Sequence, residues 1–202
     1  MKYCGFLTVA SLLLGGCATE APNDLLLDYE KVEATTILDA PSSLPGTYSP
    51  QRRGVVARGE YLVELLGCGV CHTDGALIGD PNFERSLAGS QIGIAYANPV
   101  GDKNPGVIYP SNITPDEKTG IGNWTDDQLA KAIRSGIGRH GSRRLAWMPW
   151  RGYAKLSDDD ANAIVSYLRT IESVEHRVPD EVGPGKAARK PFVYFGVYRS
   201  KR

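Results

Sequence analysis

Two cysteines and a histidine form the most informative pattern in this sequence. Cys68-Gly69-Val70-Cys71-His72 has the C-x-x-C-H spacing that marks covalent attachment of haem. At the end of a helix, two thiols three positions apart can reach the two vinyl groups on one porphyrin edge. The next residue can then present an imidazole nitrogen to the iron. The pattern therefore predicts one haem c, held by thioethers at Cys68 and Cys71, with His72 as an axial ligand.

Two other kinds of site share the C-x-x-C pair. Thiol–disulfide exchange proteins use it in a strand–helix–strand setting, and no such setting is visible around residues 50–100. Zinc sites need further Cys or His ligands, and the chain has no second cysteine pair of this spacing. Haem attachment is therefore the favoured interpretation.

The first 16 residues are predicted to be a secretory signal. Met1-Lys2 gives a positive start, and the apolar run over residues 6–14 is too short to cross a bilayer as a helix. The run ends in Leu14-Gly15-Gly16-Cys17-Ala18, which resembles a bacterial lipobox and implies cleavage before Cys17 and a lipid on its sulfur. We expect a lipoprotein of the bacterial cell envelope that faces the periplasm, attached to the membrane through Cys17.

The second axial ligand is predicted by counting the candidates. Haem iron in electron-transfer proteins is often held by His and Met. Once Met1 is lost with the signal, Met148 is the one methionine that remains. It lies in Trp147-Met148-Pro149-Trp150, where the proline stiffens the loop and both tryptophans could shield the haem from water. Met148 is therefore the predicted ligand.

Other side chains near this loop have less specific interpretations. His140 and His176 are the alternative iron ligands, and both are interpreted as ordinary surface histidines. Four arginines precede the methionine loop, and they could pair with haem propionates, face an acidic redox partner, or simply be solvated. They are Arg134, Arg139, Arg143 and Arg144.

Four segments are expected to position these residues. Residues 17–53 contain prolines and excess acidic charge and are interpreted as a tether. Residues 54–67 predict a helix leading into Cys68, with one apolar face. Residues 125–136 and 157–172 predict two more helices, capped by Thr125 and Ser157. The predicted apolar face of the first helix contains Ala57, Tyr61, Leu62, Leu65 and Leu66.

Two segments have little regular periodicity. Residues 73–124 hold eight glycines and five prolines, and so long a loop suggests that something organises it, such as a large apolar cofactor. Residues 174–202 form a tail with seven Lys or Arg residues, three acidic residues and interleaved aromatic side chains. The tail is either an arm that docks on a partner or, as we favour, a strap that packs on the domain.

The composition agrees with a single folded domain plus flanking segments. The chain has 202 residues with 42% hydrophobic side chains, and its net charge is zero with His neutral. That charge excludes the strongly basic chain expected of a general nucleic-acid binder.

Together these motifs resemble a class I cytochrome c. More narrowly, Ser111-Asn112-Ile113-Thr114-Pro115-Asp116, the stretch 119–125, and Met148-Pro149-Trp150 are similar to the cytochrome c subunits of bacterial membrane-bound alcohol, aldehyde and sugar-acid dehydrogenases. The resemblance covers residues 54–173. It implies an all-α fold with crossing terminal helices, in which the Leu62/Leu65 face meets Tyr167 and Leu168. The dehydrogenase subunits usually carry several haem domains, whereas this chain has a single C-x-x-C-H.

The resemblance implies a carrier of single electrons and not an enzyme. Its partners would be a dehydrogenase, other cytochromes or a terminal oxidase, with no nucleic acid involved. Two alternatives stay open at this point: a peroxidase or gas-binding protein with an open iron position, and a structural haem subunit of a larger redox complex.

Overall fold

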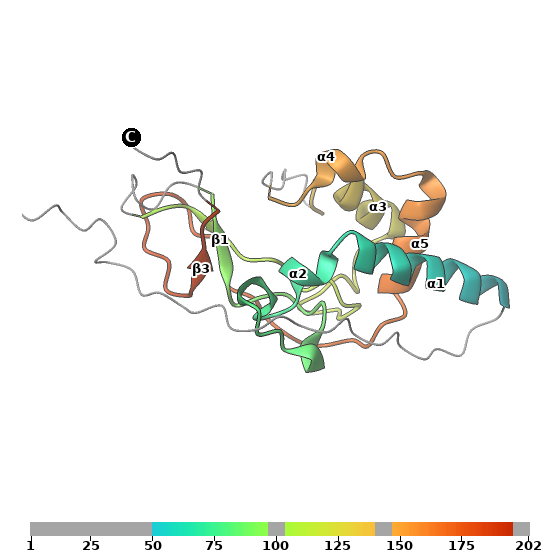
Figure 1. Ribbon diagram of the computed structural model, residues 1–202, viewed down its shortest axis with the longest axis horizontal. Helices are drawn as coiled ribbons and strands as arrows, with labels where there is room; N and C mark the ends of the chain where they lie inside the picture. The colour runs from blue at the N-terminus through green and yellow to red at the C-terminus, as the bar shows by residue number, and fades with distance from the viewer. Residues whose placement is uncertain (1–49, 97–103, 140–146, 196–202) are drawn as a thin grey trace, which may run out of the picture. The chain divides into compact units, whose positions relative to one another are not determined.

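The computed structural model describes residues 50–96, 104–139 and 147–195. The predicted signal, the lipid site at Cys17 and almost all of the tether lie outside these residues, as do His140, Arg143 and Arg144. Within the described ranges, no helix is both long enough and apolar enough to span a bilayer. The described elements build a helical body with one small sheet (Figure 1).

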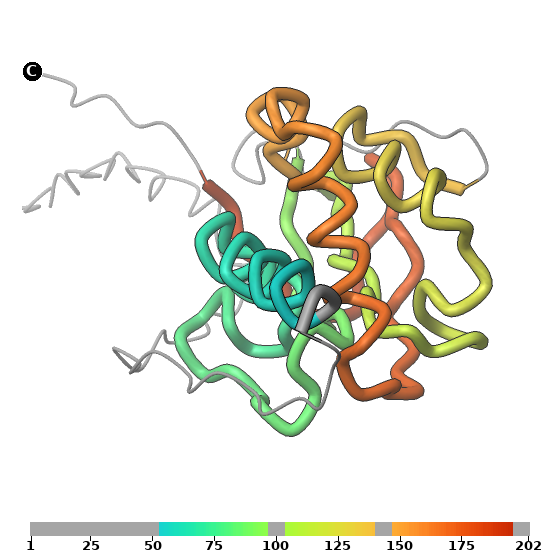
Figure 2. The backbone as a smooth tube through the Cα atoms, turned by 90° about the vertical axis from the view of Figure 1, so that its right-hand side faces the viewer, coloured from blue at the N-terminus to red at the C-terminus, as the bar shows by residue number. Residues whose placement is uncertain are grey.

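Helix α1, Pro50–Leu65, crosses helix α5, Asp158–Leu168, as the resemblance implied. Figure 2 shows the two helices side by side. The crossing is close because Gly59 lies against α5: a Cβ there would be 2.0 Å from the carbonyl oxygen of Ala163. The helix begins at Pro50, within the segment predicted as tether.

The predicted apolar face of α1 was partly wrong. Leu62 is buried, but Leu65 is 63% exposed, Tyr61 is 53% exposed and Ala57 is also exposed. The buried positions are instead Val56, Gly59, Leu62 and Val63. Gly59 explains the difference, because the contact with α5 needs the side with the smallest residue. That requirement rotates the buried stripe by one position.

Two other helices confirm their predicted caps. Helix α3, Asp126–Ser135, begins with a capping box between Thr125 and Gln128 and ends at Gly136 in the left-handed conformation. In α5, the Ser157 side chain accepts a hydrogen bond from the Asp160 N–H. The buried residues of α5 include Ile164, Val165 and Leu168, and the helix ends at Leu168, before the predicted end at residue 172. A short helix α4, Trp150–Tyr153, follows the methionine loop.

The description of the fold as all-α is not confirmed. Strands β1 (Gly93–Ala95), β2 (Val107–Ile108) and β3 (Phe192–Val193) form a sheet in the order β2-β1-β3. Strand β1 is antiparallel to β2 and parallel to β3. Two short 3-10 helices, Ala76–Ile78 and Phe83–Arg85, precede the sheet. Strands of two or three residues carry almost no periodic signal, so the sequence pattern could not predict them.

The tail packs on the domain as the favoured strap, as far as residue 195. Its β3 extends the sheet, and Phe192 and Tyr194 lie against a small core of Ala95, Val107 and Tyr109. His176 is 9% exposed, so its interpretation as a surface histidine was wrong. Its Nδ1 lies 2.8 Å from the carbonyl oxygen of Ala88, which ties the tail to the loop before β1.

Candidate functional site

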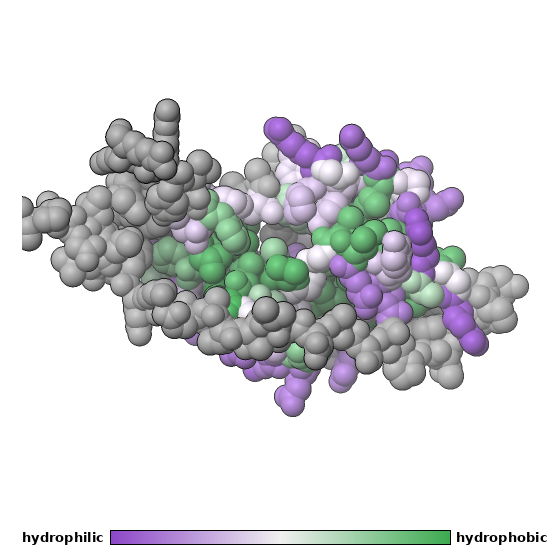
Figure 3. Space-filling model, viewed as in Figure 1, coloured by the Kyte–Doolittle hydropathy of each residue, from purple (hydrophilic) through white to green (hydrophobic). Residues whose placement is uncertain are grey.

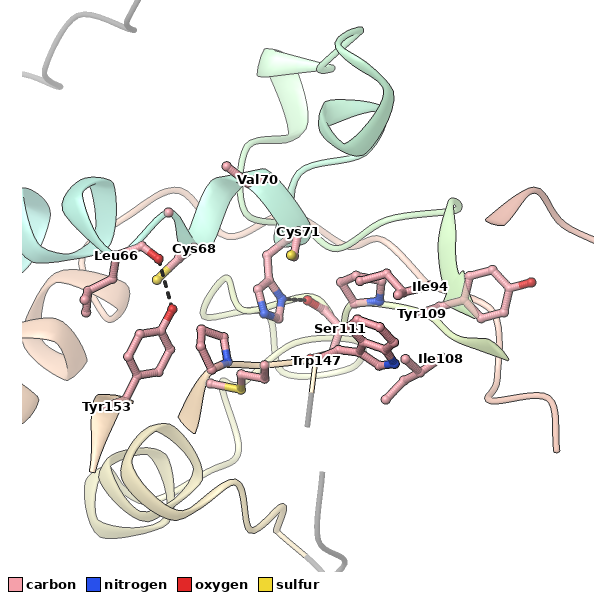
Figure 4. A pocket seen from close by; sticks show the side chains of 15 residues that line it. Leu66, Cys68, Val70, Cys71, Ile94, Ile108, Tyr109, Ser111, Trp147 and Tyr153 are labelled. Carbon is pink, nitrogen blue, oxygen red and sulfur yellow. Dashed lines mark hydrogen bonds between the residues drawn. The ribbon is translucent and has the colours of Figure 1, made fainter. Parts of the chain in front are cut away.

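Helix α2, Cys68–His72, brings both cysteines and the histidine to one cavity. Gly67 precedes it with φ 68°, a left-handed conformation that turns the chain sharply out of α1. The cavity has a volume of about 390 Å³, within the range of small-molecule and cofactor sites. Figure 4 shows the sulfurs of Cys68 and Cys71 on the α2 wall. Neither forms a disulfide within the described residues.

His72 is held by a backbone carbonyl. Its Nδ1 lies 2.7 Å from the carbonyl oxygen of Ser111, a bond drawn as a dashed line in Figure 4. A carbonyl oxygen can only accept, so Nδ1 carries the proton and Nε2 is the ring nitrogen with the lone pair. Histidines that bind a metal through one nitrogen commonly donate from the other to such an acceptor. The hydrogen bond therefore suits His72 as an iron ligand.

The methionine loop, which follows His72 by more than 70 residues in the sequence, borders the same cavity. Trp147, Met148 and Pro149 all line it. The loop is fixed by hydrogen bonds into α4: the Trp150 N–H donates to the Met148 carbonyl at 2.7 Å, and the Gly152 N–H donates to the Pro149 carbonyl at 2.9 Å. A thioether and an imidazole thus border one space, as the sequence predicted.

Trp150 does not have the predicted role of a cavity wall. The cavity lining includes Trp147 but not Trp150. The Trp150 indole instead packs over Gly136 at the end of α3, where a Cβ would lie 2.9 Å from the ring. The Arg151 guanidinium stacks over the same indole at 5.6 Å. One tryptophan therefore borders the cavity and the other joins α4 to α3.

Tyr153 is a site residue that sequence reasoning missed. Its hydroxyl donates to the Leu66 carbonyl at 2.9 Å, which links α4 to the end of α1 beside Cys68. Burial raises the pKa of the Tyr153 phenol to about 12, with a further contribution from the two nearby cysteines. The side chain is therefore neutral and adds an apolar ring to the wall. Nothing in the sequence pattern distinguished it from other tyrosines.

The small sheet supplies a second missed wall. Ile94 of β1, Ile108 of β2 and the adjacent Tyr109 line the cavity. They come from the glycine- and proline-rich segment that was expected to be organised by a cofactor. Part of that organisation comes from the chain itself, since Tyr109 donates its hydroxyl to the Lys190 carbonyl in the tail at 3.3 Å. Figure 3 shows apolar surface gathered over α2 and β1.

The cysteine thiols do not have the character of reactive thiols. Burial raises the pKa of Cys68 to about 11 and also raises the pKa of Cys71. Thiol–disulfide exchange proteins need the opposite shift, because the thiolate is the nucleophile. The raised pKa values of the two thiols therefore give no support to the interpretation as a thiol–disulfide exchange protein.

The zinc interpretation and the alternative ligand His176 have no support in the described residues. Across these residues, no group of three or more His, Cys, Asp or Glu side chains is arranged to hold a metal ion. His176 binds Ala88 and does not line the cavity. Of the four arginines, Arg134 pairs with Asp158 at the start of α5 and Arg139 is exposed.

The residues present fit a haem c. Two thiols lie one helical turn apart on one wall, and next to them is a histidine whose tautomer leaves Nε2 able to bind iron. A methionine thioether borders the same space, and the rest of the lining is mainly aliphatic and aromatic. That donor set matches His/Met ligation of haem with thioether attachment.

Several known proteins with similar sequences are subunits of bacterial dehydrogenases. The chain is 35% identical over 153 residues to the fructose dehydrogenase cytochrome subunit of Gluconobacter japonicus, covering 76% of this chain. It is 40% identical over 130 residues to the cytochrome c subunit of the quinone-dependent alcohol dehydrogenase of Gluconobacter oxydans, and 38% identical over 117 residues to the gluconate 2-dehydrogenase cytochrome c subunit of Pantoea cypripedii. These two matches cover 62% and 56% of this chain.

The matches involve one part of each relative. The chain spans 27%, 24% and 22% of the lengths of these three proteins. No family model matches the chain. The resemblance inferred from the motifs is confirmed: this chain is a homologue of one part of the cytochrome c subunits of bacterial membrane-bound dehydrogenases.

Proposed function

We propose that this chain is a monohaem electron-transfer cytochrome c, with haem attached through Cys68 and Cys71 and iron held by His72 and Met148. One observation carries the proposal: all four side chains line a single apolar cavity although the methionine is far from the C-x-x-C-H motif in sequence. When bound, the haem supplies reversible one-electron chemistry at its iron.

The protein's own residues bind and orient the haem and keep water from it. Cys68 and Cys71 would each add a thiol across a vinyl group, so that the sulfur bonds to carbon and the thiol hydrogen completes the new methyl group. The Ser111 carbonyl holds the His72 ring in place. Tyr153, Trp147 and the sheet residues Ile94 and Ile108 line the cavity and would shield a bound haem from water. Two protein ligands leave no iron position for a substrate, which favours electron transfer over catalysis.

The donor is proposed to be a dehydrogenase. Support comes from the relatives, which are named as cytochrome subunits of fructose, alcohol and gluconate dehydrogenases. In this proposal the chain accepts single electrons from such an enzyme and passes them to another cytochrome or a terminal oxidase. Because the chain corresponds to about a quarter of the length of those subunits, it would provide a single haem step in such a chain of electron transfer.

The location is proposed from the sequence around Cys17. A signal over residues 1–16 and a lipid on Cys17 would hold the protein at a bacterial envelope membrane, facing the periplasm, where c-type haem is attached. Labelled palmitate should enter the parent and not a Cys17→Ser variant, and the variant should become soluble. Equal membrane attachment of both proteins would contradict the lipid anchor.

Spectra of the purified protein test the haem site. The parent should show the narrow reduced α-band of haem c and, when oxidised, the weak far-red band that reports a methionine sulfur on ferric iron. Met148→Ala should keep the α-band, lose the far-red band and bind carbon monoxide when reduced. A parent that binds carbon monoxide readily and lacks the far-red band would contradict Met148 ligation and favour an open iron position.

A double variant tests the attachment. Cys68→Ala/Cys71→Ala should lose covalent haem in a denaturing gel stained for haem peroxidase activity. Retention of covalent haem by that variant would exclude the assignment of these two cysteines.

A further inference from the structure

The orientation of the His72 ring depends on its hydrogen bond to the Ser111 carbonyl. It therefore depends on the contacts that hold the backbone around Ser111 in place. Ser111 lies between Pro110, whose carbonyl accepts from the Ser90 N–H at 3.0 Å, and Ile113, whose N–H donates to the Leu87 carbonyl at 2.9 Å. These bonds join the loop to one side of the domain. They attach residues 110–113 to residues 87–90, and a second set of bonds attaches the same loop to the tail.

Asn112, the neighbour of Ser111, makes that second attachment. It is 2% exposed, and its Nδ2 donates to the Val174 carbonyl at 2.7 Å and to Thr119 Oγ1 at 3.0 Å. Its Oδ1 accepts from the N–H of Thr114 at 2.9 Å and from Thr114 Oγ1 at 2.7 Å. Both ends of the amide are used, so the hydrogen-bond pattern determines its orientation.

The two threonines continue the attachment to the tail. Thr119 Oγ1 accepts from the His176 N–H at 3.0 Å and donates to Asp116 Oδ1 at 2.7 Å. Thr114 Oγ1 accepts from the Val174 N–H at 3.2 Å. We call Asn112, Thr114 and Thr119 the Asn112 clasp. It joins the loop that carries the Ser111 carbonyl to tail residues 174–176, far from His72 in the sequence.

We propose that Asn112 is a positioning residue for the iron ligand: the clasp, anchored on the tail, holds the Ser111 carbonyl against Nδ1–H of His72. The inference rests on the proposed ligation of iron by His72. Donation from Nδ1–H to a carbonyl increases the electron density of the imidazole and so stabilises the oxidised iron. Loosening the clasp lengthens this bond, which exposes the Nδ1 proton to solvent and raises the midpoint potential.

The experiment compares four variants of the full haem-loaded chain with the parent. Asn112→Ala and Thr119→Val remove polar groups of the clasp. Thr119→Ser keeps the hydroxyl, and Asn123→Ala removes an exposed amide of the same loop, which donates to the Glu117 carbonyl at 2.7 Å. The readouts are the solvent-exchange rate of the His72 Nδ1 proton by NMR of the ferrous protein and the midpoint potential.

The two clasp variants should exchange the His72 Nδ1 proton at least tenfold faster than the parent and have higher midpoint potentials. Thr119→Ser and Asn123→Ala should match the parent. The backbone amide of Ile164 in α5 serves as an internal reference, because general loss of stability would accelerate both exchange rates together. Selective acceleration at His72 supports the proposal.

Parental exchange and potential in both clasp variants would overturn it. If Asn112→Ala fails to fold, the Thr119 pair decides, and identical behaviour of Thr119→Val and Thr119→Ser overturns the inference. A parent protein without His72 on the iron would contradict the proposed function itself, and the spectrum of the parent separates that result from the others.

Discussion

Gly59 of α1 lies directly against the backbone of Ala163 in α5, and a Cβ at position 59 would be 2.0 Å from the Ala163 carbonyl oxygen. Real Cβ atoms do not approach an oxygen so closely, so any larger residue must push the helices apart. This contact supports α1, and α1 leads through Gly67 into Cys68. The crossing of α1 and α5 therefore fixes the position in the fold at which the chain enters the C-x-x-C-H motif.

Gly59→Ala should destabilise the protein. Overpacking of a close contact typically costs about 1–3 kcal/mol, more than the helix gains when alanine replaces glycine. Urea unfolding of the haem-loaded protein measures the change. Gly54→Ala is the matched control, because it is in the same helix with nothing within 4 Å of the added Cβ. It should be neutral or stabilising by up to about 1 kcal/mol. Equal stability of the two variants would mean that the helices do not meet at Gly59.

Tyr153→Phe should loosen the end of the cavity beside Cys68. The substitution removes the hydroxyl that donates to the Leu66 carbonyl at 2.9 Å and leaves that acceptor without this partner. A lost hydrogen bond of this kind costs about 1 kcal/mol. Thermal unfolding followed by circular dichroism provides the measurement. Tyr61→Phe is the control, since Tyr61 is largely exposed on α1 and should change stability by less than about 0.5 kcal/mol.

Sequence patterns predicted the parts of the fold that have strong local signals. The capping box at Thr125 and the cap at Ser157 each depend on a few neighbouring residues, and the structure has the predicted helices at both. The C-x-x-C-H motif is also helical, but it lies on the separate short helix α2 and not at the end of α1. Met148 was predicted as a partner of His72 by counting the methionines, and the structure places both residues in the lining of one cavity. These predictions needed residue types and spacing, and no information on distant contacts.

The predictions that failed depend on contacts between segments far apart in the chain. The buried face of α1 is decided by Ala163, which lies 104 residues after Gly59. His176 is buried and hydrogen-bonds to the Ala88 carbonyl, 88 residues earlier in the chain, and Trp150 packs on Gly136 and does not line the cavity. The sheet walls could not be predicted because β1 pairs with the tail strand β3, and each strand is too short to show alternation.

The ion pair between Arg58 and Asp160 should make stability depend on pH in the acid range. The Arg58 side chain donates to Asp160 Oδ1 at 2.9 Å, and this bond, with one from Ser157, lowers the pKa of Asp160 below its ordinary value of 3.8. Because the folded-state pKa is the lower one, the contribution is fully present above pH 3.8. It is lost as pH falls through the folded-state pKa. Acid titration followed by circular dichroism should show it.

Asp160→Asn should remove that part of the pH dependence and bring the stabilities of variant and parent together at low pH. Asp159→Asn is the control, because Asp159 is exposed in the same first turn of α5. Its acid titration should follow that of the parent more closely. If Asp160→Asn has the same acid midpoint and slope as the parent, then the Arg58 pair does not link α1 to α5 in solution.

His176→Phe should release the tail from the domain. In the folded protein Nδ1 lies 2.8 Å from the Ala88 carbonyl, and Nε2 lies 3.2 Å from Nε2 of Gln91. Since Gln91 Nε2 is a donor that also binds the Arg177 carbonyl, His176 Nε2 must accept and Nδ1 must donate. Phenylalanine supplies neither group and leaves a buried carbonyl unsatisfied, at a cost of about 1–3 kcal/mol. Limited proteolysis should cut the tail of the variant sooner than that of the parent.

Glu175→Gln is the control for the tail, because Glu175 is its exposed neighbour and pairs with Lys118 on the surface. Exposed pairs of this kind contribute about 0–1 kcal/mol, so this variant should resist the protease almost as the parent does. The Asn112 clasp binds the same tail residues, so the His176→Phe variant should also show faster exchange of the His72 Nδ1 proton. Faster proteolysis with an unchanged exchange rate would show that residues 174–176 stay in place without the histidine, and that the clasp alone holds them.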